Sequence, residues 1–117
     1  MTHRIAITSA NGEDVDPHFS RVRHFCIADI DDEGYCLVEF REAPPWENPP
    51  GHDERVFDRI LELLFDCEAV ITGGIGPGAA TYLLRRNMRV FNAPGEVRDI
   101  LNTIIQRNLL EEEQQCR

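Results

Sequence analysis

The second half of the chain alternates short apolar runs with helical patterns, and this order constrains the fold more than any other feature of the sequence. Residues 67–72 and 88–92 have the pattern of short buried strands, while residues 53–66, 79–87 and 94–110 carry apolar side chains at helical spacing. Strand–helix–strand units need parallel strands that are joined by right-handed crossovers. The sequence therefore predicts a parallel sheet that is covered by helices.

The first half of the chain adds one more strand and an antiparallel hairpin. Residues 4–9 form an apolar first strand, and residues 25–30 and 35–41 form a hairpin around a turn in which we expect Gly34 to supply a positive φ. In the hairpin's second strand we expect strict alternation, with one face made by Cys36, Val38 and Phe40 and the other by Leu37, Glu39 and Arg41. The predicted fold class is α/β, with a five-stranded mixed sheet that has an antiparallel hairpin edge and is flanked by helices.

Size and composition fit one domain. The chain has 117 residues, of which 42% are hydrophobic and 28% charged, a balance typical of a globular core. We expect a single domain over residues 1–110 and a frayed polar tail over residues 111–117. No leader-like or membrane-spanning run is present, so we expect a cytoplasmic protein. The net charge of −9 argues against nucleic-acid binding.

The four cysteines do not form a pair with metal-binding or redox spacing. Cys26, Cys36 and Cys67 lie in or beside apolar strands, and we expect them to be small buried hydrophobic residues. Cys116 lies in the polar tail, where we expect it to be exposed. A cluster held by four thiolates is not predicted.

A proline-rich loop lies between the two halves of the chain. Residues 43–51 contain four prolines and Trp46, a composition that excludes a helix or a central strand. Two interpretations remain open: a crossover loop that folds over a site, or a rigid linker in which Trp46 is a packing anchor.

The loop after the first strand is the first candidate for chemistry. It contains Asp16, His18 and Arg21, and with Arg23 it makes a basic island that contains no acid between His18 and His24. A histidine offers a neutral imidazole to a metal, a carboxylate can orient that ring, and a guanidinium can hold an anion. The alternative is that these are ordinary surface residues.

The second candidate is the glycine-rich turn over residues 73–78, between a buried strand and a helix. Glycines let a backbone approach a ligand closely, and a helix N-terminus directs N–H groups towards an anion. The turn lacks the Lys-Ser/Thr ending of a phosphate-binding P-loop, and no acid follows where a dinucleotide site needs one. The alternative is a tight turn that needs glycine for its backbone angles. Both loops follow parallel strands, so we expect them to meet at the carboxyl edge of the sheet.

Together these motifs resemble the dinitrogenase iron–molybdenum cofactor biosynthesis family over nearly the whole chain. The matching segments, in order, are Ile5-Ala6-Ile7, the Asp16-x-His18-Phe19-Ser20-Arg21 loop, the strand from Phe25 to Asp29, Cys67-Glu68-Ala69-Val70-Ile71, Gly73-Gly74-Ile75-Gly76, and the apolar ending from Val90 to Ile105. Ser20 stands where the family usually has glycine. The resemblance implies a ribonuclease-H-like three-layer fold without the nuclease carboxylates.

The resemblance also implies a function. It implies a non-catalytic carrier or store of an iron–sulfur or molybdenum–sulfur cluster, non-covalently bound, and in an orange-protein-like subgroup a molybdenum–copper sulfide cluster. His18 is the implied metal ligand, and the expected cofactor-binding residues are His18, Phe19, Ser20, Arg21, Gly73, Gly74, Ile75 and Gly76. Expected partners are cluster donor and acceptor proteins, with no membrane or nucleic acid, and the expected state is a monomer or weak homodimer.

Two other classes of function compete with this one. A small anion-binding or regulatory interaction domain would use the glycine turn alone. A hydrolase on a nuclease-like fold would need clustered carboxylates for two metal ions. The first strand carries no acid, and Asp14 and Asp16 lie in a loop, so the sequence disfavours the hydrolase.

Overall fold

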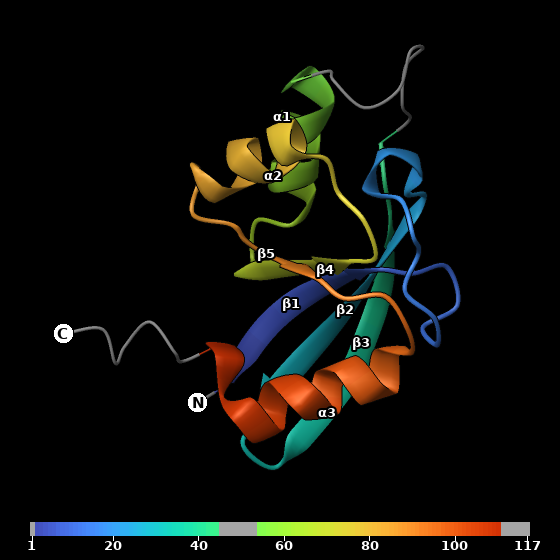
Figure 1. The fold of residues 1–117 in the computed structure, drawn as a ribbon, viewed down its shortest axis with the longest axis vertical. Helices are drawn as coiled ribbons and strands as arrows, with labels where there is room; N and C mark the ends of the chain where they lie inside the picture. Colours follow the sequence, from blue (N-terminus) through green and yellow to red (C-terminus); the bar gives the residue numbers. More distant parts are fainter. Residues whose placement is uncertain (1, 45–53, 111–117) are drawn as a thin grey trace, which may run out of the picture.

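A five-stranded mixed sheet forms the centre of the protein (Figure 1). The structure, a computed structural model, describes residues 2–44 and 54–110. The strands are β1 (His3–Thr8), β2 (His24–Asp31), β3 (Gly34–Glu42), β4 (Ala69–Thr72) and β5 (Arg89–Asn92), in the spatial order β3-β2-β1-β4-β5. β1 is antiparallel to β2 and parallel to β4, β2 is antiparallel to β3, and β4 is parallel to β5. The mixed sheet with an antiparallel hairpin edge is confirmed.

Three helices cover the two faces of this sheet, which gives three layers. α1 (Glu54–Leu63) and α2 (Pro77–Leu84) lie on one face, and α3 (Val97–Arg107) lies on the other (Figure 1). α2 begins two residues earlier than predicted, because Pro77 has the fixed φ that suits a first helical turn. α3 begins later than predicted, because Gly95 has a φ of +128° and Glu96 is extended.

Each face of the sheet has its own apolar core. On the α1 and α2 face, Phe19, Phe25 and Ile60 are among the fully buried side chains. On the α3 face, Ile7 and Leu101 are completely buried. Both cores remove apolar surface from water, and this removal contributes most of the free energy that stabilises such a domain. The loop residue Phe19 belongs to the first core, so this loop is part of the packed structure.

The hairpin turn differs from its prediction. Gly34 does not have a positive φ. Instead, a carboxylate oxygen of Asp31 accepts hydrogen bonds from the backbone amides of Glu33 at 2.8 Å and Gly34 at 3.0 Å. An aspartate that bonds to the amides two and three residues later holds such a turn by itself, so no left-handed residue is needed.

The strict alternation predicted for β3 is wrong, because a bulge interrupts it. Ile27 pairs with Glu39 and the next residue, Ala28, pairs with Leu37, so Val38 is the extra residue. The bulge moves Phe40 to the same face as Leu37. Cys36, which we expected to be buried, is exposed.

The other two described cysteines have restricted access to water. Cys26 is fully buried in the α3-side core, as predicted, and Cys67 is half-buried. Burial raises the pKa of the Cys26 thiol, and it raises that of Cys67 to about 12, with the neighbouring Asp66 carboxylate adding to the effect. Neither thiol is therefore a ready thiolate ligand at neutral pH.

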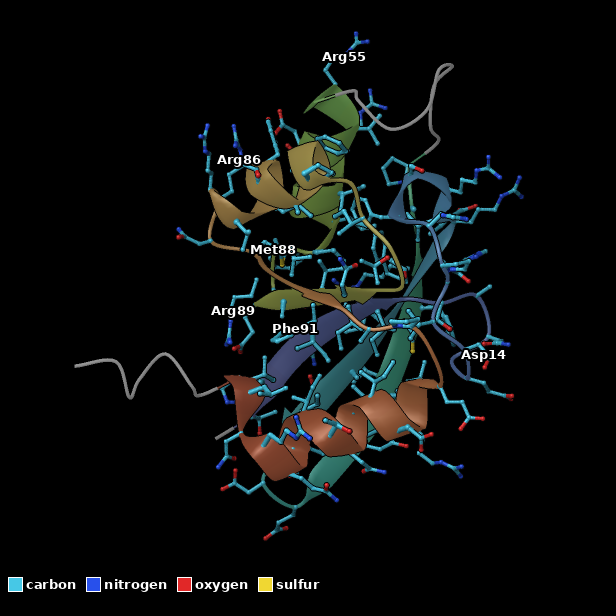
Figure 2. The ribbon with its side chains drawn as sticks, in the orientation of Figure 1. Asp14, Arg55, Arg86, Met88, Arg89 and Phe91 are labelled. Carbon is cyan, nitrogen blue, oxygen red and sulfur yellow. The ribbon has the colours of Figure 1, made fainter. Side chains whose placement is uncertain are left out.

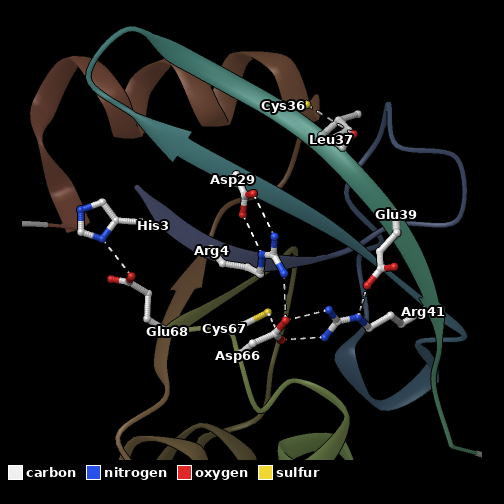
Figure 3. A network of polar contacts seen from close by, with 10 residues as sticks. All are labelled: His3, Arg4, Asp29, Cys36, Leu37, Glu39, Arg41, Asp66, Cys67 and Glu68. Carbon is white, nitrogen blue, oxygen red and sulfur yellow. Dashed lines mark hydrogen bonds and ion pairs between the residues drawn. The ribbon is translucent and has the colours of Figure 1, made fainter. Parts of the chain in front are cut away.

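An ion-pair network joins the sheet to the end of α1 (Figure 3). Arg4 donates to Asp29 at 2.7 Å and to Asp66 at 3.0 Å. Arg41 donates to Asp66 at 2.7 Å and to the backbone carbonyl of Leu63, at the last turn of α1, at 2.9 Å. Asp66 is thus held between two guanidiniums, which lower the pKa of its carboxyl well below the usual range.

Some predictions concern residues 45–53 and 111–117. The alternatives for Trp46, the frayed tail and the exposure of Cys116 fall there and lie outside the described residues. Among the residues that the structure does describe, no helix has the length and apolar character needed to cross a membrane.

Candidate functional site

The two loops singled out in the sequence meet at the carboxyl edge of the sheet, and backbone hydrogen bonds join them. The amide of Phe19 donates to the carbonyl oxygen of Gly74 at 2.8 Å, and the amide of Gly73 donates to the carbonyl oxygen of Asp16 at 2.9 Å. The amide of Asp16 donates to the end of β1, at the carbonyl of Thr8, at 2.7 Å. The expectation that these loops come together is confirmed.

The first two glycines of the turn are needed because the other loop crosses them. A Cβ atom added at Gly74 would lie 2.5 Å from the carbonyl oxygen of Pro17, and one at Gly73 would lie 2.8 Å from that of Asp16. Neither glycine has a positive φ, so backbone angles do not explain them. The close approach that we expected for a ligand is made here by the chain's own loop. Gly76 differs, because it is exposed and no atom of the described residues lies within 4 Å of its Cβ position.

The site residues from the first loop divide into exposed and buried groups. His18 and Arg21 are exposed, and Ser20 is half-buried. Residues 19–21 form a short 3₁₀ turn, η1 (Phe19–Arg21), and the ring of Phe19 is buried in the core. Phe19 therefore anchors the loop and leaves His18 and Arg21 exposed.

The start of α2 supplies the other half of the site. We call the exposed residues His18, Arg21, Gly76 and Pro77 together the rim. Gly76 is the N-cap residue, Pro77 opens the helix, and no acidic residue lies in the first turn. The first amides of a helix have no acceptor within it, and they carry a partial positive charge. Ile75 is half-buried against the α1-side core, so it fixes the turn and leaves Gly76 and Pro77 exposed.

The structure adds a residue that the sequence analysis did not select. We expected Asp16 to orient the ring of His18, but the histidine that acts electrostatically on Asp16 is His24, at the start of β2. Burial raises the pKa of the Asp16 carboxyl, and the nearby His24 acts against that rise. The Nδ1 atom of His24 is buried and has no hydrogen-bond partner among the described residues.

The position of His24 follows from strand pairing. Thr8 at the end of β1 pairs with Phe25, and the amide of Ser9 donates to the carbonyl of His24. An antiparallel neighbour begins where β1 ends, so a prediction that β2 pairs with β1 would have placed the start of β2 beside this rim.

The polar residues at the carboxyl ends of β1 and β4 are buried beneath the two loops. Thr8, Ser9 and Thr72 have no exposed surface. The Thr8 hydroxyl lies near the carbonyl oxygens of Ile71 and Asp16, while the Thr72 hydroxyl has no partner within the part of the chain that the structure describes. Thr8 and Thr72 are the last residues of β1 and β4, so these polar side chains form the end of the sheet from which both loops start.

The first loop is also fixed to α3. The amide of Val15 donates to the carbonyl of Gly95 at 2.9 Å, and the amide of Val97 donates to that of Glu13 at 2.8 Å. The rim therefore rests on β1, β4 and α3 together, a rigid support of the kind that positions binding residues well.

Within residues 2–44 and 54–110, no three His, Cys, Asp or Glu side chains gather closely enough to hold a metal ion. A separate apolar hollow of about 370 Å³ lies between β5 and α3. Its lining residues were not among those predicted; they are Phe91, Asn92, Ala93, Pro94, Gly95, Glu96, Asp99, Ile100, Thr103, Ile104 and Leu109.

The fold and this rim define a class: a small three-layer α/β domain that presents one imidazole, arginine and a helix start on an open loop edge. Comparison with known proteins identifies the family. The chain belongs to the dinitrogenase iron-molybdenum cofactor family, whose model matches residues 1–107. The family expected from the sequence motifs is thereby confirmed.

Two relatives match most of this chain. The chain is 38% identical to protein NifY of Azotobacter vinelandii over 82 residues, which are 70% of this chain and 32% of NifY. It is 28% identical to protein NifX of Rhodobacter capsulatus over 88 residues, which are 73% of this chain and 55% of NifX. The chain thus spans about a third of NifY and about half of NifX.

A solved structure shares the fold. The apo form of the orange protein from Desulfovibrio gigas superposes with a TM-score of 0.68 at 20% identity, covering 90% of this chain and 88% of the orange protein. At this identity the likeness supports the fold.

Proposed function

We propose that this protein binds and carries an anionic metal–sulfur cluster, as cargo, during the assembly of a nitrogenase-type cofactor. The cargo is an iron–sulfur or molybdenum–sulfur cluster, including a molybdenum–copper form, and it binds non-covalently. The observation that carries the proposal is the backbone junction of Phe19 with Gly74, at 2.8 Å, because it brings the His18 loop and the start of α2 onto one rim.

The chemistry of the rim suits such a cargo. A sulfide-bridged cluster is a bulky anion whose metals already have most of their ligands. One imidazole from His18, the guanidinium of Arg21 and the positive start of α2 supply a metal ligand and charge-assisted contacts. Membership of the family and the likeness to NifX and NifY support a role in cofactor assembly.

The openness of the rim supports carriage rather than permanent storage. His18, Arg21 and Gly76 are exposed, so a bound cluster remains accessible to a protein that receives it. A single protein ligand also allows release, since few bonds have to be exchanged. In this proposal Gly73, Gly74, Phe19, Ser20 and Ile75 shape the rim.

The remaining parts of the proposal follow from this role. The protein acts without catalysis, in the cytoplasm, as a monomer or weak homodimer, and its partners are cluster donors and acceptors. Residues 1–110 form its single domain, with a ribonuclease-H-like arrangement.

The proposal is tested by anaerobic reconstitution of the purified protein. We expect incubation with ferrous iron and sulfide, or with tetrathiomolybdate and cuprous ion, to give visible charge-transfer absorption that remains with the protein on desalting. His18→Ala should weaken binding about tenfold or more, because a metal ligand is lost. Cys67→Ala should bind as wild type does, because Cys67 precedes β4 and the glycine turn follows β4, so this thiol lies at the opposite edge of the sheet.

Two variants that each remove one arginine charge complete the test. Arg21→Gln should weaken cluster binding, whereas Arg98→Gln, at another exposed arginine on α3, should not. A wild-type protein that stays colourless in every reconstitution, or equal losses in His18→Ala and Cys67→Ala, would contradict the proposal. A colourless protein that phosphate compounds stabilise thermally would support the small anion-binding alternative.

A further inference from the structure

One end of this acidic protein carries six of the eleven arginines that the structure describes. The chain has a net charge of −9, and α1 contributes Asp58 and Glu62 at this end; the six arginines come from the η1 loop, from α1 and from the two residues after α2. These are Arg21, Arg23, Arg55, Arg59, Arg85 and Arg86. In Figure 2, Arg86 lies on the outer side of α2 and Arg55 at the far end of α1, both away from α3. An uneven field of this kind selects and orients charged partners.

An open hollow follows the outer surface of α2 at this end. It has a volume of about 600 Å³ and is lined by Pro77, Gly78, Thr81, Tyr82, Arg85 and Arg86. No carboxylate is among these lining residues. The hollow begins at Pro77, next to Gly76, so it adjoins the rim on which the two loops meet.

One cation of the hollow is held in place before any partner arrives. The guanidinium of Arg86 stacks over the ring of Tyr82, with its carbon 3.7 Å from the ring centroid. The Tyr82 hydroxyl in turn donates to a carboxylate oxygen of Asp58 on α1 at 2.7 Å. The same oxygen lies 3.9 Å from Nε of Arg86, so Asp58 offsets part of the charge of Arg86, and Arg85 is the other cation of this end. A planar guanidinium fixed on an aromatic ring loses little entropy when it binds a carboxylate in a bidentate manner.

Both ends of the hollow are positive. At one end Pro77 and Gly78 belong to the first turn of α2, which carries the helix's partial positive charge. At the other end lie Arg85 and Arg86. The eight residues of α2 span about 12 Å, a length that about four residues of an extended peptide cover.

We propose that this face of α2 docks an acidic segment of a partner protein. Carboxylates of that segment would pair with Arg85 and Arg86 at one end and face the start of α2 at the other. Its position beside the rim makes it a docking surface for the donor or acceptor of the cargo, and this last point rests on the proposed function. A second copy of this chain fits less well, since each copy brings a net charge of −9.

The test uses the apo protein, so its result does not depend on cluster binding. A fluorescein-labelled oligoglutamate peptide is titrated with wild-type protein at low and at physiological salt, and anisotropy is measured. We expect binding that weakens with salt, no binding of an oligoglutamine peptide, and a roughly tenfold loss in the double variant Arg85→Glu with Arg86→Glu.

The matched control is Arg98→Glu with Arg107→Glu, which changes the net charge equally on α3. This variant should retain most of the binding, and thermal unfolding shows whether both variants are folded. The proposal would be overturned by no peptide binding by wild type, by equal losses in the two variants, or by a single-stranded oligonucleotide that binds as tightly with the same arginine dependence. Sedimentation that shows dimers lost only in Arg85→Glu with Arg86→Glu would also overturn it, because a second copy would then be the occupant.

Discussion

The amide of Phe19 donates to the carbonyl oxygen of Gly74 at 2.8 Å, and this bond joins two segments that are 55 residues apart in the chain (74 minus 19). The ring of Phe19 is buried in the core beside α1 and α2, so the bond also connects the rim to the packed interior. A change in the glycine turn should therefore alter both stability and the presentation of His18.

Gly74→Ala tests this coupling. The new Cβ atom would lie 2.5 Å from the carbonyl oxygen of Pro17, and Gly74 also accepts the hydrogen bond from Phe19, so a shift that relieves the clash strains this bond. We expect a loss of about 1–3 kcal/mol in the free energy of unfolding, as for other overpacked sites. Urea denaturation followed by circular dichroism measures it.

The control for this change is Gly34→Ala. No atom of the described residues lies within 4 Å of the Cβ position of Gly34, and its φ is not positive. We expect a change within about 0.5 kcal/mol in the free energy of unfolding. Equal losses in the two variants would show that the contact between the loops does not explain the glycine.

The sequence predicted the sheet and the meeting of the two loops because both follow from topology. Strand–helix–strand order fixes parallel pairing, and loops after parallel strands share one edge. The reason for Gly73 and Gly74 could not be predicted in the same way. A glycine needed for a ligand and one needed for a crossing loop give the same sequence pattern, and only the position of Pro17 distinguishes them.

Asp66→Asn tests the network that ties α1 to the sheet. Asp66 accepts from Arg41 at 2.7 Å and from Arg4 at 3.0 Å (Figure 3). Loss of these charge-assisted bonds should lower the free energy of unfolding by about 1–3 kcal/mol at neutral pH. Asp32→Asn, in the exposed hairpin turn, is the control and should change it by less than about 0.5 kcal/mol.

The pH dependence of the Asp66 effect has a definite sign. The folded-state pKa of Asp66 is depressed by its two guanidiniums, so the stabilisation is present above the ordinary carboxyl pKa and is lost as the pH falls towards the folded-state value. The difference between wild type and Asp66→Asn should therefore shrink steadily below about pH 4. A difference that is constant down to low pH would mean that the network contributes packing and not charge.

Cysteine alkylation tests the accessibility of the thiols. With a pKa of about 12, Cys67 has roughly a thousandfold less thiolate at pH 8 than an ordinary cysteine. Under native conditions iodoacetamide should therefore modify the exposed Cys36 and leave Cys67 and the buried Cys26 unmodified. Peptide mass spectrometry with and without denaturant measures this. Rapid native labelling of Cys67 would contradict its half-buried position beside Asp66.

Pattern reasoning failed twice in β3, for the burial of its residues and for their faces. Cys36 is exposed, but so are Leu37 and Phe40 on the opposite face, because β3 is the edge strand of the sheet. Alternation predicts the face of a strand residue only while the register is unbroken, and the bulge at Val38 shifts every residue on one side of it. No residue type in β3 marks a bulge. The role of Asp31 in the turn was, by contrast, within reach, since aspartate commonly bonds to the following amides.

The last prediction concerns Asp16, whose carboxyl has a raised pKa because it is partly buried, with His24 acting against the rise. A carboxyl with a raised folded-state pKa keeps a proton that the unfolded chain has already released. Stability is therefore lost as the pH rises from the ordinary carboxyl pKa, about 4, through the folded-state value. Asp16→Asn removes this cost, so its free energy of unfolding relative to wild type should improve as the pH rises above about 4.

Asp14→Asn is the matched control, because Asp14 is an exposed aspartate in the same loop. Its difference from wild type should stay flat over that range. If Asp16→Asn becomes less stable relative to wild type as the pH rises, attraction between Asp16 and His24 outweighs burial. The two residues then form an ion pair beneath the rim, and His24→Gln should reproduce the loss. The sign of this pH dependence therefore decides whether burial or pairing with His24 dominates at the Asp16 carboxyl, next to the proposed cargo site.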